Sequence, residues 1–198
     1  MDRADIFIYA MIFFVFMVCL KIYSENELWT LKCIVSKVDG MKYCVRERHK
    51  KQEAVDLIAV IIQKCKKLVN YVHKKYPDNP DVKRLYKNFD PKTVSETLPT
   101  SELTAYSENK GEKIAFCLNT DKLNDNVLID ENTLTFVAIH ELSHIMTPSI
   151  GHNQDFWKNF KFLLENSQQI NIYNPIDYKR NPTQYCGMQI NDNPLYDL

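Results

Sequence analysis

Hydrophobic residues follow different patterns along this chain of 198 residues. They form an unbroken run from Ile6 to Leu20, whereas from Gln52 to Tyr76 they recur at the spacing of an amphipathic helix. The segments 29–45 and 103–118 are β-prone, and each contains a turn sequence with glycine. The pattern predicts an α+β domain of helices and a small β-sheet that follows an apolar N-terminal helix.

The N-terminal apolar run predicts a membrane anchor. Ile22 and Tyr23 extend it to a length that can cross a bilayer once, and it is apolar on every side, unlike most core helices. A cleaved signal peptide is the alternative, but the run is preceded by acidic residues and no A-x-A-like site follows it. We therefore predict a transmembrane anchor over 1–23, with lipid contact through 6–23, and one domain over 24–198.

Charges and cysteines favour a cytoplasmic location for that domain. Arg3 is the only basic residue before the run, whereas Lys21, Lys32 and Lys37 follow it, and Lys and Arg accumulate on the cytoplasmic side of a span. The six cysteines are scattered and form no C-x-x-C pair, which indicates mostly reduced or buried thiols. We predict a single-pass membrane protein.

The segment 29–45 predicts a β-hairpin. Asp39-Gly40 lies between two β-prone runs and is a strong signal for a two-residue turn. With that turn, Cys33 and Cys44 would be diagonal neighbours rather than directly opposite. A disulfide between them would require a different register.

The most informative motif is His140-Glu141-Leu142-Ser143-His144, an H-E-x-x-H sequence. Asp130, as an N-cap, predicts the start of a mainly apolar helix that carries the motif. Two histidines four positions apart on one helix face can bind one Zn²⁺, and the glutamate can take a proton from a metal-bound water. Two core histidines that bond to the backbone are the structural alternative, although polar groups on a buried helix need partners that a metal would provide.

His152 is the predicted third ligand of the zinc. Pro148 and Gly151 end the motif helix and allow the chain to turn back toward it. A second helix is then predicted over 153–166. Asp155 and Glu165, both on that helix, are the alternative third ligands.

His140-Glu141-Leu142-Ser143-His144, Gly151-His152 and Phe156-Trp157 together resemble the zincin metallopeptidases of the SprT-like and WLM groups. The match covers about 130–164, and His152 comes two residues later than in the common zincin pattern H-E-x-x-H-x-x-G-x-x-H. The chain after the anchor also resembles small membrane-anchored metallopeptidase-like proteins of large DNA viruses, through 185–188 and 193–195. The resemblance implies hydrolysis of peptide bonds in protein or peptide substrates by a zinc-activated water, with Glu141 as general base.

The same resemblance implies roles for residues outside the motif. Zincins commonly place a strand along the cleft, and 114–118 is the candidate, with a core strand as the equal alternative. Tyr185 or Tyr178 could donate a hydrogen bond to the oxyanion, and Asp177 could orient a ligand histidine. His73 is assigned to the scaffold. Phe156 and Trp157 are assigned to the core rather than to a substrate pocket.

The charge composition does not favour a nucleic-acid partner. Lys+Arg and Asp+Glu are both 25, so the net charge is zero. The SprT-like and WLM groups are associated with repair of DNA–protein crosslinks, but this chain lacks the basic surface that such work would favour. The alternative to a peptidase is a membrane-anchored structural or virion protein that keeps the zincin fold without proteolysis.

Overall fold

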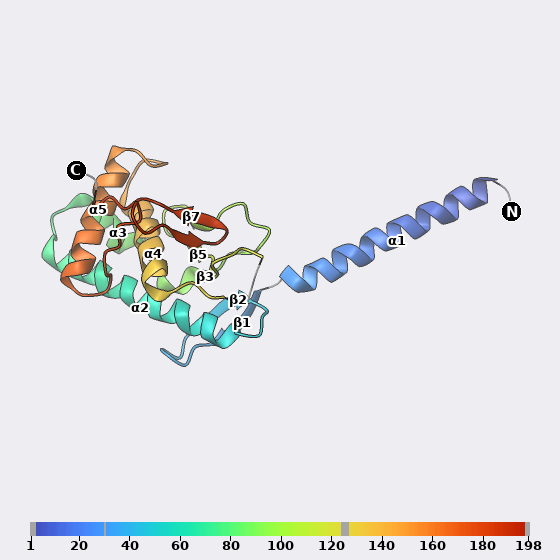
Figure 1. Cartoon of the computed structure of the whole chain (residues 1–198), viewed down its shortest axis with the longest axis horizontal. Coiled ribbons are helices and arrows are strands. Elements are labelled where there is room, and N and C mark those ends of the chain that lie inside the picture. Colours follow the sequence, from blue (N-terminus) through green and yellow to red (C-terminus); the bar gives the residue numbers. More distant parts are fainter. Residues whose placement is uncertain (1–2, 30, 124–126, 197–198) are drawn as a thin grey trace.

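A long helix extends away from an α+β domain in the computed structural model, which describes residues 3–29, 31–123 and 127–196 (Figure 1). Residue 30 of the predicted hairpin and the residues at both chain ends lie outside this description. The helix is α1, Arg3–Trp29. Its window Asp5–Ile22 is long and apolar enough to cross a membrane and is not buried by the domain. Insertion into a membrane stays a prediction.

The domain contains a mixed five-stranded sheet in the order β1-β2-β3-β5-β4. Neighbours β1 and β2 are antiparallel, as are β4 and β5, whereas β3 pairs in parallel with β2 and β5. The strands are β1 (Leu31–Val35), β2 (Lys42–Arg46), β3 (Val94–Glu96), β4 (Ala105–Glu108) and β5 (Lys113–Phe116). Of the two alternatives for 114–118, the structure shows an interior strand, because β5 pairs with β3 on one side and with β4 on the other, and β4 is the edge strand.

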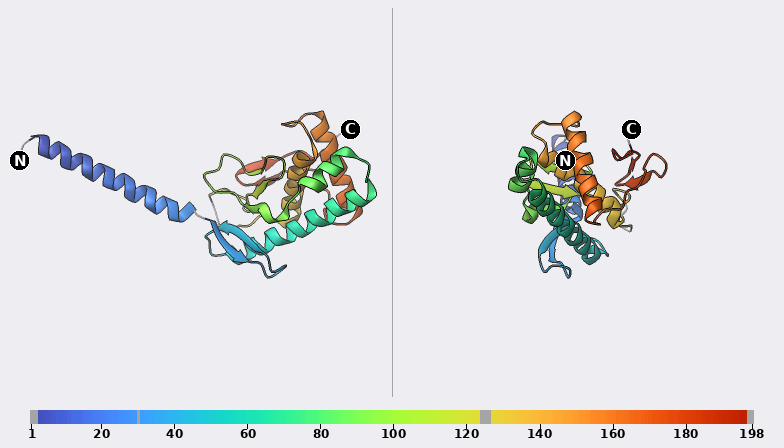
Figure 2. Two further views of the ribbon diagram at one scale, coloured as in Figure 1. Left: turned by 180° about the vertical axis from the view of Figure 1, so that it is seen from behind. Right: turned by 90° about the vertical axis from the view of Figure 1, so that its left-hand side faces the viewer.

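Four helices of the domain pack beside this sheet (Figures 1 and 2). They are α2 (Lys51–Lys75), α3 (Pro80–Asn88), α4 (Glu131–Met146) and α5 (Gln154–Gln169). The central helix is α4, which contacts α2, α3, α5 and strand β4. Helices α2, α4 and α5 agree with the sequence-based predictions to within a few residues, because each has a clear apolar face or an N-cap residue.

The first hairpin forms, but not with the predicted turn. Six residues, Ser36–Met41, connect β1 and β2 instead of two, and Cys33 lies directly opposite Cys44. The connection is held by α2, because the carboxylate of Asp56 accepts hydrogen bonds from the Ser36 hydroxyl and the Lys37 N–H. This tertiary contact determines the register in place of the local turn signal.

Two disulfides contradict the prediction of mostly reduced thiols. Cys33–Cys44 joins β1 to β2, and Cys117–Cys186 joins the end of β5 to the turn between β6 (Thr183–Tyr185) and β7 (Met188–Ile190). Disulfides persist mainly in oxidising compartments, so the thiols no longer support a cytoplasmic domain. The predicted orientation now rests only on the lysines that follow the apolar run.

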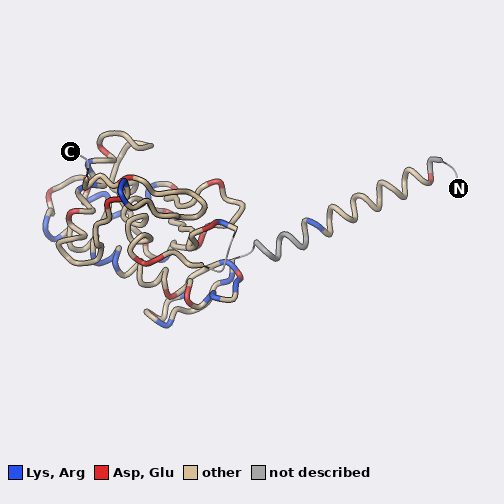
Figure 3. The backbone as a smooth tube through the Cα atoms, viewed as in Figure 1, with Lys and Arg blue, Asp and Glu red and all other residues tan. Residues whose placement is uncertain are grey.

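The C-terminal segment packs over the domain as predicted. Ile172, Tyr173, Tyr178 and Tyr185 are all buried, and β6 and β7 form a separate two-stranded hairpin. Along the backbone of the domain, Lys and Arg positions are interspersed with Asp and Glu positions (Figure 3). In this fold, α4 is surrounded by the other helices of the domain, by the edge strand β4 and by the C-terminal hairpin of β6 and β7.

Candidate metal centre

Helix α4 places the first two histidines of the motif on one face. It begins where the Asp130 carboxylate accepts a hydrogen bond from the Thr133 N–H, as predicted. Most of its remaining surface is buried against the other helices. His140 and His144 are only partly buried, and Glu141 between them is 4% exposed.

A turn after α4 brings His152 back to the same place. The helix ends at Met146, and Gly151 adopts a left-handed conformation with φ of 83°, which glycine adopts without strain. The next helix begins at Asn153, whose side chain accepts a hydrogen bond from the Phe156 N–H. His152 is therefore held between a flexible turn residue and a defined helix start.

The three imidazoles converge through their Nε2 atoms. The separations are 3.2 Å for His140–His144, 3.1 Å for His144–His152 and 3.1 Å for His140–His152. Nitrogen ligands of a tetrahedral zinc, at about 2.0–2.1 Å from the metal, lie roughly 3.3 Å apart. Three lone pairs directed at one point would repel each other without a cation, so the donor set fits Zn²⁺ with one position open for water.

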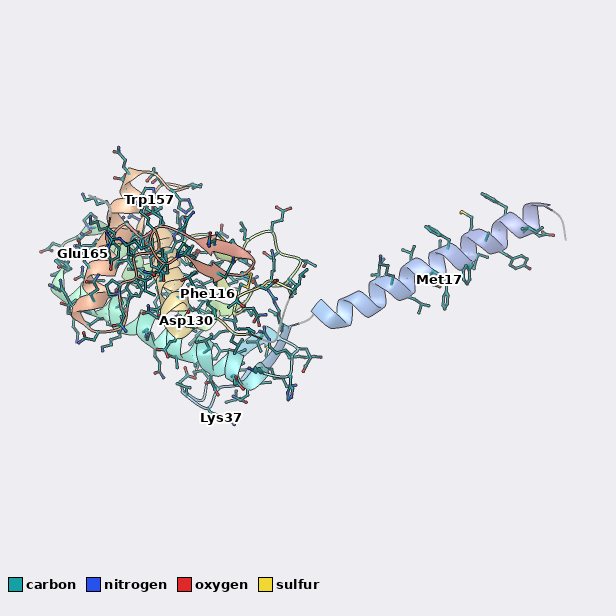
Figure 4. All side chains as sticks on the ribbon, in the orientation of Figure 1. Met17, Lys37, Phe116, Asp130, Trp157 and Glu165 are labelled. Carbon is teal, nitrogen blue, oxygen red and sulfur yellow. A yellow bond between two sulfur atoms is a disulfide. The ribbon has the colours of Figure 1, made fainter. Side chains whose placement is uncertain are left out.

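The cluster contains none of the alternative ligands. Among the described residues, His140, His144 and His152 are the one group of three or more potential ligands with this spacing. Asp155 and Glu165 are exposed on α5 and lie outside it (Figure 4 labels Glu165). His73, which was assigned to the scaffold, stacks on Tyr86 and lies outside the cluster.

An aromatic ring forms the floor of the cluster. The Phe156 ring is fully buried, and its centroid lies 4.9, 4.4 and 4.6 Å from the ring centroids of His140, His144 and His152. Trp157 differs from the prediction that it belongs to the core. It is 41% exposed, lines the cleft and lies 5.8 Å from the His152 ring (Figure 4). Because Phe156 and Trp157 are consecutive on a helix, their side chains point in different directions, Phe156 into the core and Trp157 toward the cleft.

Burial determines the protonation of the site. Burial, with smaller contributions from neighbouring cationic groups, lowers the pKa of His140 to about 3 and that of His144 to about 4. Both imidazoles are therefore neutral at pH 7, which is the form that binds metals. In the metal-free chain, burial also raises the pKa of Glu141 to about 8.

A lysine far away in the sequence fixes the end of the motif helix. The Lys110 ammonium donates hydrogen bonds to the carbonyls of His144, Thr147 and Ser149, at 3.1, 2.9 and 2.6 Å. These carbonyls end α4 and begin the turn that leads to His152. Their negative dipoles favour a cation. No sequence pattern identified this residue, because it lies in the turn between β4 and β5.

A cleft of about 340 Å³ opens beside the cluster. One side comes from α4 and α5, and the other from the start of β4 and the C-terminal hairpin. Its lining includes Phe136, Val137, His140, Glu141, His152, Trp157, Phe160, Thr104, Ala105, Tyr185, Met188, Gln189, Ile190, Asn191 and Asp192. The candidate metal ligands and the candidate base thus share one opening with a sheet edge.

Tyr185 is the tyrosine that lies in this cleft. Its hydroxyl donates a hydrogen bond to the Thr104 carbonyl at 3.2 Å, and burial raises its pKa. Tyr178 is fully buried against Phe136 and does not line the cleft. Asp177 accepts hydrogen bonds from backbone N–H groups of its own turn. A role for Tyr185 as an oxyanion donor stays a prediction.

Comparison with known proteins finds viral relatives, whereas no family model matches the chain. It is 30% identical over 166 residues to the uncharacterized protein R325 of Acanthamoeba polyphaga mimivirus, which covers 82% of this chain and 83% of that protein. It is 33% identical over 69 residues to the uncharacterized protein 136R of Invertebrate iridescent virus 6, which covers 35% of this chain and 38% of that protein.

Two solved structures also overlap the fold. The crystal structures of Wss1 and of a Wss1 mutant from Saccharomyces cerevisiae both align with a TM-score of 0.49. Their sequences are 20% and 19% identical to this chain over the aligned part. The alignments cover 64% of this chain and 87% and 88% of theirs.

Proposed function

The chain belongs to the family of the uncharacterized protein R325 of Acanthamoeba polyphaga mimivirus, and we propose that it is a membrane-anchored, zinc-dependent peptidase. The observation that carries the proposal is the convergence of three Nε2 atoms within 3.2 Å beside a buried glutamate, in an open cleft. Three imidazole nitrogens that face one another at this spacing need a cation between them, which favours a metal centre over packing alone.

The chain supplies the ligands and the base of this mechanism. His140, His144 and His152 would hold Zn²⁺, which when bound polarises a carbonyl and lowers the pKa of a water. Glu141 accepts a proton at its carboxylate and delivers it to the leaving amine. Because Glu141 is almost fully buried, little bulk water competes for that proton. Tyr185, which lines the cleft and donates to the Thr104 carbonyl, would donate to a developing negative charge after release of that bond.

The sheet edge provides a way to bind the peptide. Strand β4 pairs with β5 on one side, and its other side is the end of the sheet. Thr104 and Ala105, at the start of β4, line the cleft beside Glu141. An extended substrate would add to this edge by main-chain hydrogen bonds, which places a peptide bond next to the metal with little dependence on side-chain identity.

The helix α1 would keep this activity at a membrane surface. Its apolar span makes no burying contact with the domain, so it is free to insert in a bilayer. The substrates would then be proteins or peptides that reach the same surface.

Cleavage of an unfolded protein by the full chain in detergent tests the proposal. We expect zinc-dependent cleavage that stops when a chelator removes the metal and returns when Zn²⁺ is added. His73→Ala, which removes a histidine outside the cluster, should cleave as fast as the wild type. Absence of cleavage by zinc-loaded protein, or cleavage that a chelator does not affect, would contradict the proposal and favour a structural role.

A further inference from the structure

Beyond the metal ligands the cleft continues into a recess with apolar walls. Phe136 and Val137 lie one turn before His140 on α4, and both line the cleft. Phe160, on α5, lies 5.2 Å from the His140 ring and 5.1 Å from the Phe136 ring, between ring centroids. The recess therefore begins at a metal ligand and is floored by continuous aromatic and aliphatic surface.

The opposite wall of the recess is the C-terminal hairpin. Met188 and Ile190 on β7 line it. The hairpin is fastened to the domain by the Cys117–Cys186 disulfide and by two backbone hydrogen bonds, from the N–H groups of Cys186 and Gly187 to the carbonyls of residues 119 and 120, each at 3.0 Å. The recess is thus formed before any substrate binds, which lowers the entropic cost of binding.

The mouth of the recess leaves apolar surface uncovered. Met188 is 48% exposed and Trp157 is 41% exposed, and both line the cleft. A ligand side chain that covers them would gain from burial, in proportion to the apolar area removed from water.

The charges around the recess do not favour a charged side chain. No Lys or Arg is among the described residues that line the cleft, and the lining carboxylate of Asp192 already pairs with Lys179 at 3.3 Å. A charged substrate side chain in the recess would lose hydration without gaining a partner of opposite charge.

We propose that this recess selects substrates that carry a bulky apolar side chain, such as that of phenylalanine, leucine or methionine, next to the cleaved bond. The proposal rests on the proposed peptidase function and specifies its substrate class. The volume of the whole cleft, about 340 Å³, lies at the small end of ligand pockets and suits one large side chain together with the adjoining main chain. Met188 is the specificity-determining residue at the mouth.

The first test is the cleavage pattern of the full chain on a randomised peptide library, read by mass spectrometry. We expect cleavage sites enriched in large apolar residues at one position beside the bond. Met188→Arg should reduce that enrichment and raise the share of acidic residues at the same position. Val35→Arg is the matched control, because Val35 is an exposed apolar strand residue on β1, at the far edge of the sheet. It should leave the pattern unchanged.

The second test does not need turnover. Malonyl hydroxamates with a benzyl group, an isobutyl group or hydrogen beside the hydroxamate are titrated into zinc-loaded Glu141→Gln chain. We expect the benzyl and isobutyl compounds to bind about tenfold more tightly than the unsubstituted one, and Met188→Arg to abolish this difference. Zinc-dependent binding with equal affinities, or library cleavage without apolar enrichment, would overturn this inference alone. Absence of both cleavage and zinc-dependent hydroxamate binding would overturn the proposed function, and this inference with it.

Discussion

The two sides of the cleft are built in different ways. The helical side takes the candidate metal ligands, the candidate base and the aromatic floor from one continuous stretch of chain, 136–160. The strand side joins the start of β4 to the C-terminal hairpin, and a disulfide between residues 69 positions apart holds the hairpin in place. Residues that are close together in the sequence therefore supply the candidate ligands and base, whereas contacts between distant parts of the chain determine the shape of the cleft. The two sides should therefore respond differently to substitution.

The largest expected effect is on the helical side, at Glu141. Glu141→Gln keeps the shape of the side chain but removes the proton acceptor, so turnover should fall by about 10³ or more while bound zinc is unchanged. Turnover and zinc content of the same sample measure this. Glu165→Gln on α5 is the control and should behave as the wild type. A Glu141→Gln chain that cleaves at the wild-type rate would refute the general-base role.

The next effect is on the strand side, at the Cys117–Cys186 disulfide. Replacing both cysteines by serine should lower stability by about 4 kcal/mol, because the bond closes a long loop in the unfolded chain. Zinc binding should persist, because no ligand lies on this side. The control is the same replacement of Cys33 and Cys44, which are 11 positions apart at the far edge of the sheet. Loss of this disulfide should lower stability by about 3 kcal/mol, because the loop it closes is shorter. Chemical denaturation measures the stability of the two double-serine variants, and their zinc content shows whether the metal site persists. Loss of zinc in the Cys117–Cys186 variant would show that the sides are not independent.

Lys110 should have a smaller effect that links the two sides. It lies in the turn after β4 but donates to three carbonyls at the end of α4 and in the turn that follows. Lys110→Met should lower stability by about 2 kcal/mol and weaken zinc binding, because the position of His152 depends on that turn. Lys110→Arg should restore part of both. Lys113→Met, an exposed lysine on β5, is the control. Unchanged zinc affinity in Lys110→Met would mean that the turn holds its shape without the lysine.

The smallest expected effect is that of pH on the metal-free helical side. The pKa of His140 is about 3 in the folded chain and 6.5 as its ordinary value, so between these pH values only the unfolded chain binds the proton and stability falls as pH falls. Glu141 acts in the opposite sense. Its pKa is about 8 in the folded chain, so as pH falls the folded chain binds this proton before the unfolded chain does, and stability rises. We therefore use Glu141→Gln, in which His140 and His144, whose pKa is about 4, act in the same sense, so that stability should fall by about 1–2 kcal/mol between pH 7 and pH 6. Denaturant midpoints measure this. A stability that stays constant or rises would contradict the burial of neutral His140.

The helical side was largely predictable from the sequence. The period of the apolar residues and the N-cap Asp130 define α4, and the spacing of His140 and His144 follows from the helix repeat. The return of His152 was predicted from Pro148 and Gly151, because a helix break before a histidine limits where the side chain can go. These are all local properties, so a single sequence is enough to infer them.

The strand side was not predictable, for physical reasons that differ among its parts. The Cys117–Cys186 pair has no spacing pattern, since the fold alone brings the two residues together. The choice between an edge strand and an interior strand for 114–118 stayed open, because strand order depends on the parallel pairing of β5 with β3, which no local pattern encodes. Trp157 was assigned to the core from its apolarity, but its position on α5 directs it toward the cleft.

The most direct test of the account is the zinc content of the purified full chain, compared with His152→Ala, Asp155→Ala and Glu165→Ala. We predict about one zinc per chain in the wild type and in the two carboxylate variants, and loss or strong weakening in His152→Ala, because three imidazoles form the site. Absence of zinc from the wild type after metal is added, or retention in His152→Ala with loss in Glu165→Ala, would contradict the three-histidine centre.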